Sequence, residues 1–181
     1  MTEKFKEVKE SEVVMSELML PSHSNFNGKI HGGYVLSLLD QIAFACASKH
    51  SRAYCVTASV DTVDFLKPIE IGELVTMKAS VNYVGRSSMV IGIRVEAENI
   101  QTGEIKHCNS SHFTMVAKDN NGESLAVPGL ILKTDDDIRR FAKSIKRIGM
   151  KKKRKQEFHD TDFISEEYLH IQELENVKIE K

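Results

Sequence analysis

The sequence predicts an α+β fold in which one antiparallel sheet curls around a single long helix. The stretch from residue 32 to about residue 50 has the composition of an almost uncharged helix, and at least four long segments of alternating apolar and polar residues follow it. Alternation of this kind is typical of strands with one covered face, and the short turns between them favour antiparallel pairing. Wrapping the sheet around the helix is the most economical packing.

The composition limits the class of protein. The chain has 181 residues, a net charge of −1 and three widely spaced cysteines without CxxC or Cys/His metal spacing. This length favours one domain with an appendage. The cysteine pattern indicates reduced thiols, with no disulfide framework and no metal site. Because the N-terminus lacks a signal-peptide apolar region and no run could span a bilayer, we expect a soluble, cytoplasmic protein without membrane insertion.

The first part of the chain leads into the helix. Residues 1–12 are polar, and we expect a flexible N-terminus there. Apolar residues between 13 and 20 predict a first strand that Pro21 ends. The turn-forming segment PSHSNFNG then precedes the helix, which we expect to end between residues 49 and 52.

Asp40 is the one carboxylate in the middle of this helix. The rest of the helix is apolar almost all round, which is typical of a helix enclosed by other structure. A buried carboxylate costs several kcal/mol unless it is paired, hydrogen-bonded or protonated. Asp40 therefore has a functional role, or it accepts a structural hydrogen bond or reaches a wet crevice.

The second part of the chain is predicted to form the sheet and a C-terminal helix. Turn signals at Gln101–Gly103 and Asn120–Gly122 separate the later strands, and the predicted strands cover 54–66, 74–84, 87–100 and 104–119. We assign 13–130 to the main domain and 131–155 to a basic helix that begins at Thr134–Asp137 and ends near Gly149. Residues 156–181 are assigned to a tail.

Several separated motifs carry a family resemblance. The blocks PSxxNxNGxIHGGYVLSLLD, VTASVDTVDFLKPIEIGE, VGRSSM and FTMVAKDNNG occur in this order within residues 13–150. The chain thereby resembles the hotdog-fold acyl-CoA thioesterases, specifically the acyl-CoA hydrolase group of bacterial short-chain and brain-type cytosolic enzymes. The resemblance implies a single hotdog domain, with a long central helix wrapped by a curved antiparallel sheet and followed by a C-terminal helical extension.

The resemblance also implies a reaction and its site. It implies hydrolysis of acyl-CoA to a free acid and coenzyme A without a cofactor, at sites formed between two subunits, with Asn25 and Asp40 contributed by facing chains. Asp40 is expected to act as a general base on water or as a nucleophile through an anhydride. The backbone amides of Gly32 and Gly33 are candidates for stabilising the oxyanion. Alternatively, Asn25 is a turn residue or N-cap, and the glycines permit close packing.

Coenzyme A carries phosphates, and two segments are candidates for binding them. The segment Gly85, Arg86, Ser87 and Ser88 resembles the CoA-side loop of the family, although it also fits an ordinary turn. The basic run Lys151, Lys152, Lys153 and Arg154 is a second candidate, together with Arg139, Arg140, Lys146 and Arg147. We expect several of these cations to converge, because single exposed charge pairs contribute about 1 kcal/mol or less.

Other functions remain open from the residues. The basic run could bind nucleic acid or an acidic membrane, but the near-neutral total charge and the absence of a nucleic-acid fold signature argue against this. A hotdog hydratase or dehydratase would pair His31 with Asp40. A non-catalytic acyl-CoA-binding protein of the same fold is a further alternative, but no helix-turn-helix segment precedes the predicted sheet. The HGG motif, Asn25 and the GRSS block favour hydrolysis. We expect a homodimer with sheets joined edge to edge, assembled into a trimer of dimers.

Overall fold

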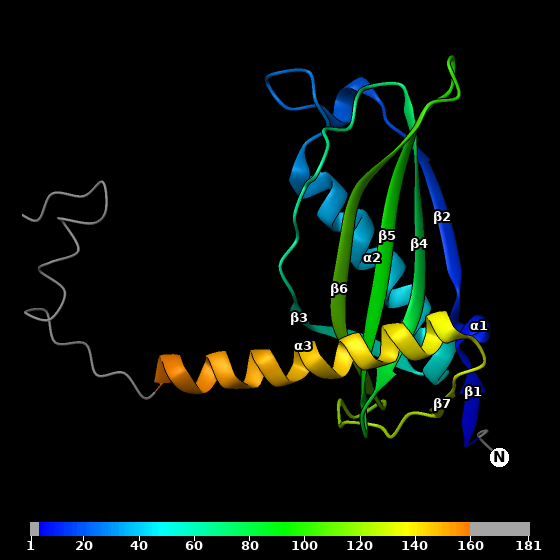
Figure 1. The fold of residues 1–181 in the computed structure, drawn as a ribbon, viewed down its shortest axis with the longest axis vertical. Coiled ribbons are helices and arrows are strands. Elements are labelled where there is room, and N and C mark those ends of the chain that lie inside the picture. Colours follow the sequence, from blue (N-terminus) through cyan, green and yellow to red (C-terminus); the bar gives the residue numbers. More distant parts are fainter. Residues whose placement is uncertain (1–3, 160–181) are drawn as a thin grey trace, which may run out of the picture. The chain divides into compact units, whose positions relative to one another are not determined.

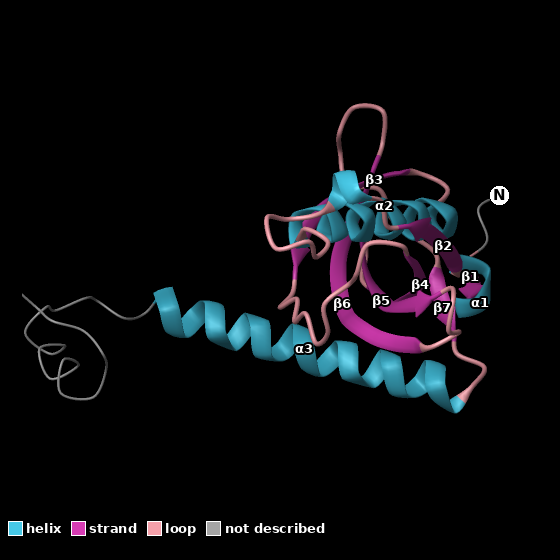
Figure 2. Ribbon diagram, turned by 90° about the horizontal axis from the view of Figure 1, so that it is seen from above, coloured by secondary structure: helices cyan, strands magenta, loops and turns pink. Residues whose placement is uncertain are grey.

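The computed structural model describes residues 4–159, and in them a five-stranded antiparallel sheet curls around one long helix (Figures 1 and 2). This confirms the predicted α+β hotdog architecture. The long helix is α2 (Gly32–Ser51). The strands of the sheet are β2 (Val13–Leu18), β3 (Tyr54–Val60), β4 (Glu73–Val84), β5 (Ser88–Asn99) and β6 (Ile105–Lys118).

The order of the strands places β2 and β3 at the two edges. Across the sheet the order is β2-β4-β5-β6-β3, and every neighbouring pair is antiparallel. The chain leaves α2 and enters β3 within three residues, so the helix and this edge strand are neighbours in sequence as well as in the fold. Strand β3 is hydrogen-bonded to β6 on one side and leaves its other side open in the described part of the chain.

The core lies between α2 and the concave face of the sheet. The apolar side chains that fill it come from one face of the helix and from alternate positions of the strands, among them Val35, Leu39, Ile42, Cys46, Val75, Met77, Ile91, Val95, Phe113 and Met115. Burying one such side chain contributes about 1.5–3 kcal/mol. The apolar residues that repeat every 3.6 positions in the helix and every second position in the strands therefore fill one common core.

The opposite face of α2 is exposed in a single chain. Leu36 and Phe44 have exposed fractions of 37% and 39%, and the exposed Asp40 lies one turn from each. In a single chain, the prediction of a helix enclosed by other structure is therefore wrong for this face of α2. The sheet curls around one side of the helix only, so apolar residues on the other side face outward.

Part of the N-terminal segment forms regular structure, although the sequence predicts a flexible N-terminus over residues 1–12. Residues 5–11 form β1 (Phe5–Glu7) and α1 (Val8–Ser11), and β1 pairs in parallel with β7 (Gly129–Ile131). The mostly polar pattern conceals this order because burial depends on partners far along the chain. The ammonium of Lys6 donates a hydrogen bond of 2.9 Å to the carbonyl of His50.

The C-terminal helix α3 (Asp135–His159) begins where the sequence predicts but continues past Gly149. At its start, Thr134 Oγ1 accepts a hydrogen bond from the Asp137 amide, and an Asp137 oxygen accepts one from the Thr134 amide. The predicted end near Gly149 is wrong, because one interior glycine costs only about 1 kcal/mol and Lys and Arg favour helix. Residues 156–159 of the predicted tail belong to α3, and the others lie outside the described residues.

The chain divides into two compact units, residues 1–144 and residues 145–181. The first unit contains the sheet, α2 and the start of α3, and the domain boundary predicted at residue 130 stays a prediction. Among the helices of the described residues, none combines the length and apolar content needed to cross a membrane. In the same part of the chain, His, Cys, Asp and Glu side chains nowhere gather in a group that could hold a metal ion.

Candidate active site

The contact that defines the candidate site joins helix α2 to the edge strand β3. Thr57 Oγ1 donates a hydrogen bond of 2.5 Å to Asp40 Oδ1. The carboxylate is exposed in one chain and is therefore accessible to a ligand. Thr57 was not predicted from the sequence, because its proximity to Asp40 depends on how β3 packs beside α2.

An irregularity in β3 follows Thr57 directly. The pairing of β3 with β6 runs from Thr57 opposite Met115 to Ser59 opposite Thr114, so Ala58 is an extra residue. A bulge of this kind bends the strand and changes the direction of nearby side chains. Thr57 Oγ1 also lies 3.4 Å from Met115 Sδ, and the two contacts together hold the hydroxyl in place.

Asn25 occupies a tight turn before α2. Its side-chain Oδ1 accepts hydrogen bonds from the amides of Asn27 (2.9 Å) and Lys29 (3.1 Å), and Gly28 closes the turn with a φ of +72°. Because backbone N–H groups only donate, these contacts identify the oxygen of the Asn25 amide. Its NH2 group is therefore the part that can donate to a ligand. No hydrogen bond joins Asn25 to Asp40 within the described part of one chain.

His31 and the two glycines form the N-terminal cap of α2. The ring Nδ1 of His31 accepts a hydrogen bond of 3.0 Å from the Gly33 amide. A Cβ at position 33 would lie 2.8 Å from the same ring, so Gly33 permits this close approach. The Gly33 amide is thereby engaged, which makes the Gly32 amide, at the first helical position, the better oxyanion candidate of the two.

The segment Gly85–Ser88 connects β4 to β5 at the same end of the sheet as Thr57. In the register, Ser88 pairs with Val116, which in turn pairs with Val56 of β3. Ser88 and Val56, the residue before Thr57, are therefore separated by two strand spacings, or about 10 Å, in the plane of the sheet. The loop is fixed by the Val127 amide, which donates to the Arg86 carbonyl (3.0 Å), and the Arg86 side chain is exposed.

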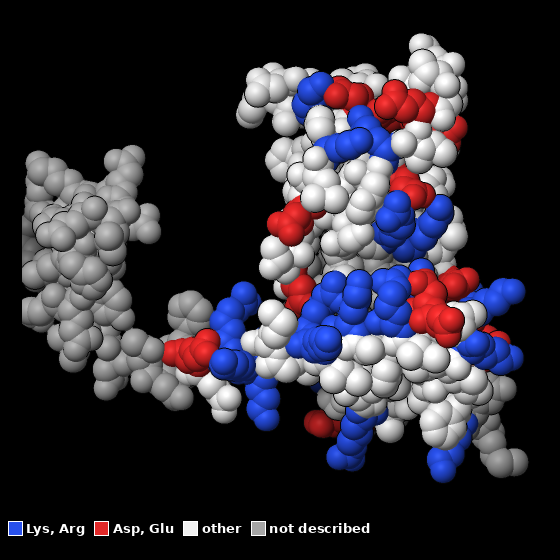
Figure 3. Space-filling model, viewed as in Figure 1, with Lys and Arg blue, Asp and Glu red and all other residues white. Residues whose placement is uncertain are grey.

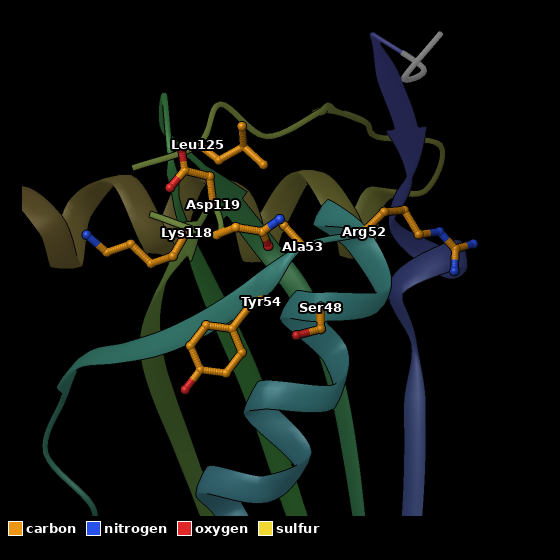
Figure 4. A pocket seen from close by; sticks show the side chains of 8 residues that line it. Ser48, Arg52, Ala53, Tyr54, Lys118, Asp119 and Leu125 are labelled. Carbon is orange, nitrogen blue, oxygen red and sulfur yellow. The ribbon is translucent and has the colours of Figure 1, made fainter. Parts of the chain in front are cut away.

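A surface pocket of about 560 Å³ lies at the start of β3 (Figure 4). It is lined by Ser48, Arg52, Ala53, Tyr54, Lys118, Asp119, Asn120 and Leu125. Figure 4 shows that the side chains of Arg52 and Lys118 point in opposite directions. The two cations therefore do not converge on one anion in this arrangement.

Basic side chains gather along α3 (Figure 3). At its start, Arg139 and Arg140 both pair with the Asp136 carboxylate. The pKa of Asp136 is lowered, mainly because Arg139 donates a hydrogen bond to its carboxylate. Arg140 also donates to Ser80 Oγ at 3.3 Å. The predicted phosphate ligands Lys151, Lys152, Lys153 and Arg154 belong to the second unit, and their role stays a prediction.

The fold and the family comparison define the class of protein. The chain belongs to the thioesterase superfamily, which matches residues 27–104. Two relatives from bacteria are similar over most of their length. Protein VdlD of Helicobacter pylori is 44% identical over 141 residues, which cover 78% of this chain and 80% of that protein. An uncharacterized acyl-CoA thioester hydrolase of Bacillus subtilis, YkhA, is 37% identical over 147 residues, covering 81% of this chain and 86% of that protein.

Solved structures of acyl-CoA thioesterases are similar as well. A hexameric acyl-CoA thioesterase is 35% identical with a TM-score of 0.81, over 83% of this chain and 97% of that chain. The acyl-CoA hydrolase of Staphylococcus aureus, in complex with butyryl-CoA, CoA and CoA disulfide, is 31% identical with a TM-score of 0.79, over 86% of this chain and 94% of that chain.

Variants of the S. aureus enzyme have also been solved. In each of them one residue is replaced by alanine: an asparagine, an aspartate or a threonine. In that enzyme the aspartate follows the asparagine by 15 positions, and the threonine follows the aspartate by 17.

Proposed function

We propose that this protein hydrolyses acyl-CoA thioesters to a free carboxylic acid and coenzyme A. The observation that carries the proposal is the hydrogen bond from Thr57 to an accessible Asp40 carboxylate, on a helix face that also exposes Leu36 and Phe44. Such a surface suits an acyl thioester, and the carboxylate suits the activation of water. The family membership of the chain supports the same reaction class.

In the proposed mechanism, Asp40 is the general base. Its carboxylate accepts a proton from water while the water oxygen attacks the thioester carbonyl, and general-base assistance of this kind is typically worth about 100- to 10,000-fold in rate. Thr57 orients the carboxylate through its hydrogen bond. When the tetrahedral intermediate collapses, the carbon–sulfur bond breaks and the sulfur of coenzyme A leaves with the electron pair and takes up a proton.

Two further groups are proposed to act on the carbonyl oxygen. The NH2 of Asn25 donates toward it from the facing subunit, because the turn already engages the oxygen of that side chain. The Gly32 amide is the second donor, at the N-terminus of α2 where the helix dipole favours negative charge. A route through an anhydride of Asp40 is the alternative. In single-turnover hydrolysis in ¹⁸O-water, attack of water on the aspartyl carbonyl of that anhydride would place the isotope in Asp40, whereas general-base catalysis leaves Asp40 unlabelled.

The spacing of the three residues supports their assignment. Asn25, Asp40 and Thr57 are separated by 15 and 17 positions, as are the three residues replaced in the S. aureus variants. The alternative of a hydratase or dehydratase, which pairs His31 with Asp40, has less support. The ring of His31 accepts a hydrogen bond from Gly33 and caps the helix, so its Nδ1 is already engaged.

The proposed assembly is a dimer in which two β3 edges pair, with three such dimers forming a hexamer. The open edge of β3 and the exposed apolar face of α2 are adjacent surfaces that a second copy would cover. The hexameric state of a similar thioesterase is consistent with this. The proposed arrangement brings Asn25 of one subunit to Asp40 of another.

Coenzyme A is proposed to lie across the Gly85–Ser88 loop. The exposed Arg86 guanidinium is the proposed phosphate ligand, and Ser87 and Ser88 supply polar groups about two strand spacings from the reacting centre. The basic run Lys151, Lys152, Lys153 and Arg154 is proposed as a further set of phosphate ligands. No cofactor is required by this chemistry.

The test is an assay of thiol release from acyl-CoA substrates of several chain lengths, with the Asp40→Asn variant beside the wild type. The variant should lower kcat/KM by about 100- to 10,000-fold and keep the wild-type melting temperature, because the side chain is exposed. Glu104→Gln, which neutralises an exposed acid in the turn before β6, is the matched control and should keep full activity. Full activity of Asp40→Asn would refute the assignment.

A further inference from the structure

Phe26 is the most exposed large apolar side chain in the described part of the chain. It is fully exposed, at the second position of the turn Asn25–Gly28, where turns usually place Pro, Asp, Ser or Gly. Nothing in the turn requires an aromatic residue, since the turn is closed by the Asn25 side chain and by Gly28. The folding of one chain therefore leaves this residue unexplained.

The turn that carries Phe26 is firmly held. The Asn25 amide donates to the Lys29 carbonyl (2.7 Å), and the Ile30 amide donates to the Ile69 carbonyl (2.9 Å). The Lys29 ammonium lies 2.6 Å from Glu70 Oε1. Because the turn is fixed at both ends, the ring of Phe26 is presented in a defined position and costs little entropy to dock.

The position of Phe26 in an assembly follows from that of Asn25. Adjacent Cα atoms are about 3.8 Å apart, so a subunit that brings Asn25 to a thioester bound at the facing Asp40 brings Phe26 to the same cleft. The surface that receives it is the exposed face of α2, where Leu36 and Phe44 lie one turn before and one turn after Asp40. An aromatic ring and two apolar side chains would then face each other across the substrate.

We propose that Phe26 forms a wall of the acyl-binding site of the facing subunit and determines the preference for acyl chain length. This inference rests on the proposed function. The acyl chain lies between the ring of Phe26 from one subunit and Leu36 and Phe44 of the other. Each methylene buried there gains about fourfold in binding, so the contribution of Phe26 grows with the length of the chain.

The experiment compares wild type, Phe26→Ala and Phe26→Leu with acetyl-, butyryl-, hexanoyl- and octanoyl-CoA. In Phe26→Ala we expect kcat/KM for octanoyl-CoA to fall at least about tenfold, while kcat/KM for acetyl-CoA stays within about twofold. Phe26→Leu should recover most of the loss. Ile100→Ala, which removes an exposed apolar side chain from the turn after β5, is the matched control and should leave all four substrates unchanged.

The mass of the assembly, measured by light scattering after gel filtration, separates the outcomes. Loss that grows with chain length in an intact assembly supports the proposal. A uniform loss for all four substrates, dissociation of the assembly, unchanged kinetics or faster turnover of long chains would each overturn it. An inactive wild type would instead show that the proposed function is wrong, so the two failures are distinguishable.

Discussion

Thr57 Oγ1 and Asp40 Oδ1 lie 2.5 Å apart, so the edge strand β3 directly orients the one carboxylate in the middle of helix α2. The bond is charge-assisted and therefore stronger than a bond between neutral groups. Both residues are exposed in a single chain, and the bulge at Ala58 follows immediately. The candidate site thus lies where the helix and the open edge of the sheet meet.

Removing this hydrogen bond should impair turnover more than substrate binding. Thr57→Val keeps the shape of the side chain but lacks the donor, and a hydrogen bond to a charged group is worth about 1.5–3 kcal/mol. We expect kcat to fall about 10- to 100-fold, with KM little changed. Thr57→Ser retains the hydroxyl and should stay within about threefold of wild type in the same steady-state assay. Equal activity of the valine and serine variants would contradict the orienting role.

The two roles of Asn25 are separable by substitution. Asn25→Asp keeps an oxygen that accepts from the amides of Asn27 and Lys29 but removes the NH2 donor. We expect this variant to keep the turn and to lose activity, whereas Asn25→Ala should lose both. Hydrogen exchange of the Asn27 and Lys29 amides reports on the turn, and the thiol-release assay reports on activity. If Asn25→Asp is fully active, Asn25 serves the turn alone.

The cysteines should resist thiol reagents in the folded protein. Cys46, Cys55 and Cys108 are buried and free, and burial raises the pKa of Cys46 to about 12. At pH 8 the thiolate fraction of Cys46 is then on the order of one in ten thousand. We expect negligible labelling by an aromatic disulfide reagent until urea unfolds the chain. Rapid labelling under native conditions would show that the interior opens readily, and the thiol-release assay would then need a different detection reagent.

His50 should make the protein less stable below neutral pH. Its Nε2 donates to the Pro128 carbonyl (2.9 Å), while its buried Nδ1 has no partner in the described part of the chain. Burial is the main cause of a lowered pKa for His50, and the Lys6 ammonium adds to it. The unfolded state therefore binds a proton at His50 more readily than the folded state does. The contribution of neutral His50 to the free energy of unfolding is present above about pH 6.5, and it is lost as the pH falls through the lowered pKa of His50 in the folded state.

Urea unfolding at pH 7.5 and pH 5.5 measures this effect. The free energy of unfolding of the wild type should be smaller at pH 5.5. His50→Gln keeps a donor for Pro128 but cannot titrate, so the difference between the two pH values should shrink in this variant. An identical difference in wild type and variant would assign the pH dependence to other groups.

The sequence by itself determined the architecture, because local periodicity suffices for it. The alternation in β4, β5 and β6 predicts a sheet with one covered face. The apolar helix that ends at Ser51 has to bury its side chains, and this face of the sheet is where it can pack. The position of Asp40 as the one acid in that helix was also visible in the sequence. The family motifs added Asn25, Gly32, Gly33 and the Gly85–Ser88 loop as candidates.

The tertiary structure decided which groups meet. Thr57 reaches Asp40 because β3 returns along α2, the Gly33 amide is engaged by His31, and residues 5–11 are ordered because β1 pairs with β7. The exposed face of α2 likewise results from a sheet that covers only one side of the helix. Contacts of this kind join residues far apart in the chain, and no local pattern encodes a distance between two elements that pack only after the chain has folded.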